Sequence, residues 1–346
     1  MRIGIYTDVH CCYTSSILPI HCKSSKYSVR LQMIIDTFRW MYETFRKNNV
    51  DLIINCGDLF DSYNIRAEEV CAMSEALSYG GDIPEIHILG NHEIVDNHRT
   101  FYANGLLSQC SHIKVVDQPL KLQNGISLLP YMPWNNAVEV LPMLSNRYLF
   151  SHVDIKGSAV TPQHCLTEGV DPDKLTDFFE IVVNGHLHSP QSWRDRIFNI
   201  GATTSLSFSD NSSYRPRVSI LDTDTNNFQF FTNPYAITFI KASISTIEEL
   251  RNYLNIYPKV MRIQCASTLK PEIEQILLDR DDVVAYRIQT TDAHVLTEAE
   301  APDIDSNVDG GLITQFRQFI SSFNDLKYPV EDYISVINEM EAITGD

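Results

Sequence analysis

A chain of 346 residues, 44% of them hydrophobic, is long enough to form one large globular domain and a smaller one. Its formal net charge of -17 argues against a protein coated in basic surface for nucleic acid and against attraction to an anionic membrane, although divalent metals or a basic partner could still neutralise phosphate locally. The eight cysteines form no CxxC pair and no apolar run approaches the ~18 residues that span a bilayer, so we expect a soluble, cytoplasmic protein with free thiols.

Five short apolar runs end abruptly in glycine, carboxylate, amide or imidazole residues. In chain order, the runs lead into Asp8-Val9-His10, Gly57-Asp58-Leu59-Phe60-Asp61, Gly90-Asn91-His92-Glu93, Ser151-His152 and Gly185-His186-Leu187-His188. Apolar runs this short are typical of buried parallel strands, and ligands bind beyond the carboxyl ends of such strands in open α/β sheets. We therefore expect the five strand ends to converge on one metal site that holds two ions.

Amphipathic helices alternate with these strands. Ser28 caps a helix whose apolar residues recur at helical spacing from Leu31 to Phe45, and a second helix is expected from Arg66 to about Tyr79. The remaining elements of this region are helices near 101–107, 138–144 and 175–179, and strands near 114–116, 126–129, 196–200 and 217–221, the last two hairpin-like. The alternation predicts a layered α/β domain over residues 1–234.

From Tyr235 the pattern changes. Short strands at 238–241, 260–263 and 283–288 alternate with two helices, which predicts a small α+β domain over residues 235–291. Residues 292–311 carry six acids and neither lysine nor arginine, and they predict an acidic linker. Residues 312–346 place apolar side chains at helical spacing, which predicts a helical tail that docks on a partner, or else packs on the small domain or on a second copy of the chain.

The residue types at the five strand ends indicate metal chemistry. Imidazole, carboxylate and amide ligands together suit Mn, Fe, Zn or Mg better than a metal that selects thiolates. Asp8 and His10, two residues apart, should point to one side of an extended backbone, and the same holds for His186 and His188. A carboxylate such as Asp58 can bridge two cations through both of its oxygens.

Two further features lie near these motifs: a histidine that could take part in catalysis, and a cluster that contains cysteines. His92 follows the expected ligand Asn91, so its imidazole could protonate a leaving oxygen rather than bind metal. A second cluster invites a zinc interpretation, but its spacing fits no pattern of zinc ligands, and we interpret it as ordinary packing; its members are Cys11, Cys12, His21 and Cys22.

The five motifs, taken together, resemble the signature of calcineurin-like metallophosphoesterases over roughly the first 230 residues. Three stretches resemble the SbcD nucleases, especially the recombination endonuclease subunits of tailed phages: Gly57 to Asp61, Leu129-Pro130-Tyr131, and Gly201 to Ser207. The resemblance implies a layered sandwich of mixed sheets flanked by helices, followed by a small DNA-binding cap domain and a helical C-terminal tail. It also implies a two-metal deoxyribonuclease, with Mn²⁺ or alternatively Mg²⁺, that works in the host cytoplasm with an SbcC-like coiled-coil ABC-type ATPase, and it leaves a homodimer open.

The resemblance assigns roles residue by residue. One metal would be held by Asp8, His10, Asp58 and His188, and the other by Asp58, Asn91, His152 and His186, with His92 as the catalytic histidine. Ser151 stands where the family often has glycine, and Glu93 where this branch often has aspartate, and neither is a metal ligand in the family pattern. The residues Arg194, Arg196, Arg215 and Arg217 fit phosphate contact and ordinary surface charge equally well.

Three functions from different classes follow. The first is a metal-dependent exo/endonuclease for DNA recombination, repair and replication. The second is a calcineurin-like phosphoesterase for a small-molecule or protein phosphate ester, because the motifs specify the ester chemistry and not the substrate. The third is a scaffolding subunit with a degenerate site, which the intact ligand set argues against. The small domain and the apolar tail favour the nuclease, since a small-molecule phosphatase has no evident need for either.

Overall fold

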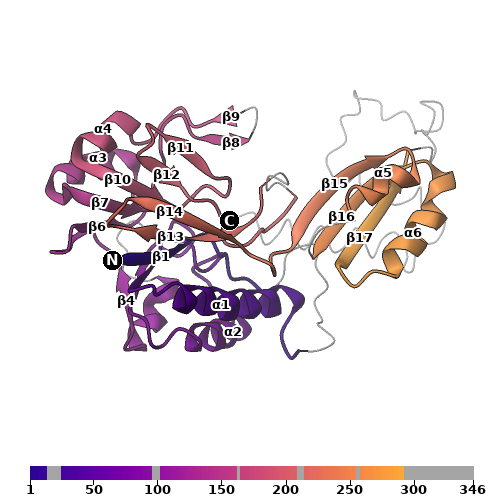
Figure 1. Cartoon of the computed structure of the whole chain (residues 1–346), viewed down its shortest axis with the longest axis horizontal. Coiled ribbons are helices and arrows are strands. Elements are labelled where there is room, and N and C mark those ends of the chain that lie inside the picture. Colours follow the sequence, from indigo (N-terminus) through magenta and orange to yellow (C-terminus); the bar gives the residue numbers. More distant parts are fainter. Residues whose placement is uncertain (14–24, 96–101, 162–163, 209–213, 255–257, 292–346) are drawn as a thin grey trace, which may run out of the picture. The chain divides into compact units, whose positions relative to one another are not determined.

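The computed structural model describes residues 1–13, 25–95, 102–161, 164–208, 214–254 and 258–291 (Figure 1). Its first sheet has six strands in the order β14-β13-β1-β2-β3-β4, with β1 to β4 parallel and β13 antiparallel to both of its neighbours. The bounds of these strands are Arg2–Tyr6 (β1), Leu52–Asn55 (β2), Glu85–Ile88 (β3), Ile113–Val116 (β4), Arg217–Asp222 (β13) and Asn227–Thr232 (β14).

The second sheet also has six strands, in the order β11-β12-β10-β7-β6-β5, and only its two edge strands run antiparallel to their neighbours. Its strands are Leu120–Lys121 (β5), Ile126–Leu129 (β6), Asn146–Ser151 (β7), Phe179–Asn184 (β10), Gln191–Trp193 (β11) and Ile197–Asn199 (β12). A separate hairpin pairs Ala159–Thr161 (β8) with His164–Cys165 (β9).

Helices cover the outer face of each sheet, α1 and α2 on the first and α3 and α4 on the second (Figure 1). Alternation along the strands separates the layers: Ile3 and Ile5 join the core between the two sheets, whereas Tyr6 and Ile53 face α1. The helices of this part are Val29–Lys47 (α1), Ala67–Ser78 (α2), Trp134–Leu144 (α3) and Pro172–Phe178 (α4), with a 3₁₀ helix at Ala103–Gln109 (η1). The expected layered sandwich of sheets flanked by helices is therefore confirmed.

Several local predictions can be compared with these elements. Ser28 caps α1 as expected, since its side chain accepts a hydrogen bond from Leu31 N. Helix α3 begins at Trp134, directly after Pro133 and four residues before the expected start at Val138. The strands expected near 196–200 and 217–221 do not pair with each other: β12 lies in the second sheet and β13 in the first, each with a hairpin partner of its own.

After β14 the chain forms a three-stranded parallel sheet, β15-β16-β17, with bounds Thr238–Ile244, Lys259–Cys265 and Val283–Thr290. One face of it packs on α5 (Ile247–Arg251) and α6 (Lys270–Leu278), through residues such as Met261 and Ile273. A 3₁₀ helix, η2 (Ser267–Leu269), precedes α6. The parallel order arises because a helical crossover connects each strand to the next, as in other βαβ units.

Residues 1–291 form one compact unit. The expected linker at 292–311 and tail at 312–346 lie outside the described residues, and the boundary at 234–235 stays a prediction. Among the helices that are described, none combines the length and the apolar character needed to cross a bilayer.

Candidate metal centre

The eight residues expected at the site follow the carboxyl ends of five strands in two sheets. Asp8 and His10 follow β1, Asp58 follows β2, and Asn91 and His92 follow β3, whereas His152 follows β7, and His186 and His188 follow β10. The two sheets pack face to face through apolar residues that include Ile54 and Phe150, and this packing brings the two sets of strand ends together. The structure thus gathers all eight in one place.

The backbone at this site is not extended. This contradicts the expectation of extended backbone for the pair Asp8 and His10 and for the pair His186 and His188. Asp8, His10, Asp58 and His186 have positive φ angles of 50°, 47°, 51° and 79°. Left-handed backbone is unfavourable for residues with a Cβ atom and persists only where surrounding structure imposes it. Here, backbone hydrogen bonds from Asp8 N to Gly57 O and from His10 N to Asp58 O, both 3.0 Å, lock the β1 and β2 loops together. The side chains converge through turns rather than through strand alternation.

Two motif glycines permit this crowding. A Cβ atom at Gly90 would lie 2.0 Å from Asp58 Oδ1, and one at Gly57 would lie 2.2 Å from His152 Nδ1. Gly57 also has a φ of +104°. Only glycine fits such close approaches without displacing the expected ligands, so these glycines serve the position of Asp58 and His152.

The first group of potential ligands is Asp8, His10 and His188. Asp61 Oδ1 lies 3.0 Å from His10 Nδ1, which places the proton on Nδ1 and leaves the lone pair of Nε2 facing His188 Nε2 at 3.0 Å. Asp8 Oδ2 accepts hydrogen bonds from Thr7 Oγ1 and His186 N, but its buried Oδ1 has no hydrogen-bond partner among the described residues. An unpaired buried carboxylate oxygen next to two imidazole nitrogens fits a divalent cation.

The second group is Asp58, Asn91, His152 and His186. His152 Nδ1 donates to Cys56 O at 2.7 Å and His186 Nε2 donates to Asp154 Oδ1 at 2.9 Å, so the lone pairs of His152 Nε2 and His186 Nδ1 point inward. Those two nitrogens are 3.3 Å apart, and both lie within 3.1 Å of Asn91 Oδ1. When both rings are neutral, these two nitrogens and the oxygens of Asn91 and Asp58 are acceptors of the kinds that divalent cations bind.

Asp58 lies between the two groups. Its Oδ2 is 3.8 Å from His10 Nε2 and 3.2 Å from His152 Nε2. Burial by itself would raise the pKa of Asp58, but the adjacent charge and hydrogen bond of His152 hold it well below its usual range. For His152, burial opposes protonation, yet Asp58 raises its pKa to about 9. The site therefore favours positive charge at the position where a metal would bind.

His92 lies beside the metal-ligand groups, and 43% of its side chain is accessible. The side chains of His10, His152 and His186 are less exposed. Its Nδ1 donates to Asp61 O at 2.9 Å, which leaves Nε2 as the nitrogen able to exchange a proton with a substrate. Its ring stands perpendicular to that of His10 at 4.8 Å, and its backbone N donates to Asp58 Oδ1. This position suits a proton donor next to the metals.

Three carboxylates and one arginine hold the site residues and their loops in place through hydrogen bonds. The sequence analysis assigned no role to these four residues. Asp61 orients His10 and His92, and Asp154 orients His186. Glu93 is buried and accepts hydrogen bonds from the backbone N–H groups of Leu59, Phe60 and Gly90. Arg30 of α1 is also buried and donates to the carbonyls of Val9, His10 and Ser205.

A sequence signal existed for the carboxylates but not for the arginine. Asp61 and Glu93 stand inside the motifs, and Asp154 stands two residues after His152. Burial and the nearby charge of Asp58 raise the pKa of Glu93, although hydrogen bonds from Gly90 and Phe60 oppose this. Glu93 thus joins the β2 and β3 loops, a role that only the three-dimensional contacts define.

The arginines considered for phosphate contact interact with groups of this chain. Arg194 pairs with Asp173, Arg196 donates to the carbonyls of Phe179 and Glu180, and Arg217 donates to Ile200 O. Of the cysteine cluster, Cys11 is buried and bridges to Phe60, whereas His21 and Cys22 lie outside the described residues.

Comparisons with known proteins add to this geometry. The sequence model of the family described as Calcineurin-like phosphoesterase matches residues 1–196. Protein 244L of Invertebrate iridescent virus 6, named as a candidate phosphoesterase, is 22% identical over 194 residues, which are 51% of this chain and 66% of that protein. Protein 078R of Invertebrate iridescent virus 3, named in the same way, is 24% identical over 182 residues, 47% of this chain and 50% of that protein. The chain thus matches between half and two thirds of the length of these relatives.

Among solved structures, TT1561 of Thermus thermophilus is similar with a TM-score of 0.39 and 11% identity, and the match covers 67% of this chain and 98% of that one.

Proposed function

We propose that this chain, which belongs to the calcineurin-like phosphoesterase family, is a metal-dependent nuclease that hydrolyses DNA phosphodiester bonds. The observation that carries the hydrolytic chemistry is the pair of metal-ligand groups on either side of Asp58, whose Oδ2 lies 3.8 Å from His10 Nε2 and 3.2 Å from His152 Nε2. The family match supports a metal-dependent phosphoester hydrolase, and the restriction to DNA is our proposal.

The residues divide into holding and reacting roles. Asp8, His10 and His188 would hold one cation and Asn91, His152 and His186 the other, with Asp58 reaching both; we assign Mn²⁺ first and Mg²⁺ as the alternative. When bound, the two cations would neutralise charge on the phosphoryl oxygens and activate water. His92 would donate a proton from Nε2 to the leaving oxygen while Asp61 O holds Nδ1.

The feature that supports DNA over a small phosphate ester is a basic row on the small sheet. Lys241, Arg262 and Arg287 occupy paired positions of β15, β16 and β17, and all three side chains are exposed. The next paired row consists of Ser243, Gln264 and Gln289. Strand pairing places each row on one face of the sheet, and this is the face opposite to α5 and α6.

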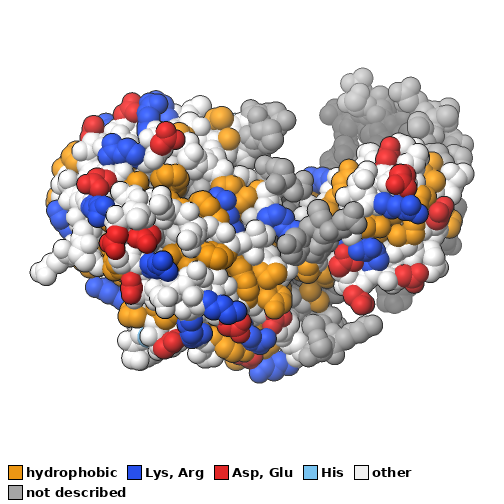
Figure 2. All heavy atoms as spheres, viewed as in Figure 1, with side chains coloured by type: hydrophobic (Ala, Val, Ile, Leu, Met, Phe, Trp, Pro, Cys, Tyr) orange, Lys and Arg blue, Asp and Glu red, His pale blue; other side chains and the backbone are white. Residues whose placement is uncertain are grey.

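This row is a local exception on an acidic protein. On the face shown in Figure 2, basic and acidic side chains are interspersed, and no broad basic field is seen. Three aligned cations beside amide and hydroxyl groups match the phosphates and sugars of a nucleic-acid strand. A small phosphate ester would need no such row.

The test measures DNA affinity against salt for a variant that carries Lys241→Glu, Arg262→Glu and Arg287→Glu. A matched control reverses three exposed lysines of the large domain, Lys114, Lys121 and Lys174, with the same change in net charge. We expect the first variant alone to bind DNA weakly, with a salt dependence that falls by about 0.9 per lost phosphate contact. Equal losses in both variants would contradict a role for the row.

A phosphoesterase for a small-molecule or protein phosphate ester is the alternative, since the same metal chemistry serves both. End-labelled linear DNA and a nitrophenyl phosphodiester, each with Mn²⁺, separate the two. A wild-type protein that hydrolyses the nitrophenyl ester but leaves DNA intact would support the alternative and contradict the nuclease.

We further propose that residues 312–346 dock on an SbcC-like ATPase. The support is the sequence pattern alone: an apolar stripe rich in phenylalanine follows an acidic segment. A chain truncated after Asp309 should keep weak metal-dependent cleavage of short DNA and lose co-purification with the ATPase. If the truncated protein aggregates, or still binds the ATPase at full strength, the tail belongs to the protein's own core or to a second copy.

A further inference from the structure

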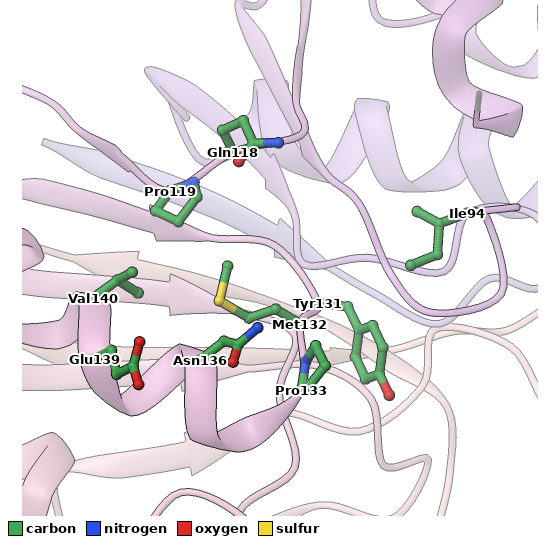
Figure 3. Close-up of a pocket in the computed structure, with 9 residues that line it drawn as sticks. All are labelled: Ile94, Gln118, Pro119, Tyr131, Met132, Pro133, Asn136, Glu139 and Val140. Atoms are coloured by element: carbon green, nitrogen blue, oxygen red, sulfur yellow. The ribbon is translucent and has the colours of Figure 1, made fainter. Parts of the chain in front are cut away.

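A cavity of about 370 Å³ is lined by the nine residues that Figure 3 shows, among them Tyr131, whose ring neighbours His152 and His186 of the metal centre. Four segments of the large domain form it: the loop after β3, the loop between β4 and β5, the turn that precedes α3, and the first turns of α3. Asn136, Glu139 and Val140 face it from α3, and their spacing of three and four residues places them on one side of that helix. The function assigned above makes no use of this cavity.

The lining of the cavity suits a flat, uncharged ligand that carries hydrogen-bonding groups. Met132, Pro133 and Val140 supply apolar surface, and Tyr131 supplies an aromatic ring. Gln118 and Asn136 supply amide groups that can both donate and accept, and Glu139 supplies an acceptor. None of the described residues that line the cavity is Lys, Arg or His, so this lining offers a phosphate no countercharge. A nucleobase has this combination of flat faces and polar edges.

Tyr131 connects the cavity to the metal centre. Its ring centroid lies 6.0 Å from that of His186 and 6.4 Å from that of His152. Its backbone N donates to Leu89 O, just before the Gly90 loop, which holds the residue against the strand end that carries Asn91. On the same side, Ile94 lines the cavity three residues after Asn91. A phosphate at the metals and a base in the cavity would therefore contact opposite sides of Tyr131.

We infer that this cavity binds one unpaired nucleobase of the DNA strand whose phosphate lies at the metal centre. The inference rests on the proposed nuclease function and deepens it, because it makes the substrate a strand with a base that has left the helical stack. Tyr131 would contact the face of the base, and the α3 side chains Asn136 and Glu139 would reach its polar edge.

The test compares two probes that share a sugar and a phosphate and differ only in the base. Binding of 2′-deoxyguanosine 5′-monophosphate and of 2-deoxyribose 5-phosphate to the full chain with Mn²⁺ is measured by calorimetry. We expect the nucleotide to bind about tenfold more tightly or better, the size of one stacked base. Val140→Trp fills the cavity and should abolish this difference in affinity. The double variant with Asn136→Ala and Glu139→Ala should reduce it.

Met143→Trp is the matched control, because Met143 lies on the same helix, is 68% exposed and does not line the cavity. It should keep the preference for the nucleotide. Equal binding of both probes by the wild-type protein, or an unchanged preference in both cavity variants, would overturn the inference. DNA cleavage by the wild-type protein, measured in parallel, separates the outcomes: cleavage without a base preference contradicts the cavity alone, and a base preference without cleavage contradicts the nuclease alone.

Discussion

Two clusters of carboxylate and imidazole lie at opposite ends of β3 and have opposite chemistry. At the start of β3, Glu85 accepts hydrogen bonds from Tyr6 Oη at 2.6 Å, Tyr42 Oη at 2.7 Å and His87 Nε2 at 2.8 Å. Beyond the end of β3, Asn91 Oδ1 faces the lone pairs of two histidine nitrogens instead. Both clusters would appear in sequence as histidine near an acid on an apolar strand.

The balance of donors and acceptors separates a structural cluster from a ligand site. Around Glu85, three donors serve the two carboxylate oxygens, so the carboxylate is satisfied by neighbouring side chains. At the metal centre, the outer nitrogens of the histidines are already paired with Asp61, Cys56 O and Asp154, so their inner nitrogens are the ones left to bind a cation. The partners behind the histidines therefore decide what the cluster can bind.

The largest effect is expected at the residue shared by both ligand groups. Asp58→Ala should abolish hydrolysis and lower the metal content, because the remaining cations would repel each other without the carboxylate between them. Metal analysis and DNA cleavage on the same preparation check this. Two ions still bound per chain would show that Asp58 does not bridge them.

His92→Gln should slow hydrolysis by about 10²-fold or more while both metals stay bound, since it removes a proton donor and no ligand. A substrate with a very good leaving group needs less protonation and should be affected less. The comparison of DNA with a nitrophenyl diester measures this. Equal losses on both substrates, or a fall in metal content, would make His92 a ligand or a structural residue.

Asp154→Ala should weaken metal binding about tenfold, because His186 loses the carboxylate that fixes its Nε2 proton and turns Nδ1 inward. Asp154→Asn keeps an acceptor oxygen and should recover part of the affinity. Competition with a chelator gives the dissociation constants of both variants. Unchanged affinity in Asp154→Ala would remove this residue from the site.

Glu85→Gln tests the other cluster and should leave metal content unchanged. Burial opposes the charge of Glu85, yet its hydrogen bonds with His87 and the two tyrosines lower its pKa below the ordinary value of 4.5. A lowered pKa means that the charged form stabilises the fold at neutral pH and that this contribution is lost as the pH falls below about 4.5. We expect the variant to lose about 1–3 kcal/mol at pH 7.

Urea unfolding of the metal-free wild type and of Glu85→Gln, at pH 7 and at acidic pH, checks this difference. The two proteins should become more similar in stability as the pH falls. A gap that widens towards acid pH would contradict the sign of the pKa shift. A loss of metal in Glu85→Gln would contradict the separation of the two clusters.

The sequence alone was sufficient for features that depend on neighbours along the chain. Apolar runs ending in glycine and polar residues located the ends of β1, β2, β3, β7 and β10, and Ser28 with its apolar periodicity located α1. The same local patterns predicted the strands and helices after Tyr235. Local propensity and periodicity act within a few residues, so they can be read without knowing the fold.

The tertiary structure decided which of these elements pair and what the polar side chains do. No local pattern indicated that β12 and β13 belong to different sheets, or that Lys241, Arg262 and Arg287 align across three strands, because register depends on distant residues. The left-handed turns at Asp8 and Asp58 and the three hydrogen bonds to Glu93 likewise come from loops far apart in sequence. The residue types at the site follow from the sequence, but which nitrogen of each histidine faces inward depends on partners that only the fold brings together.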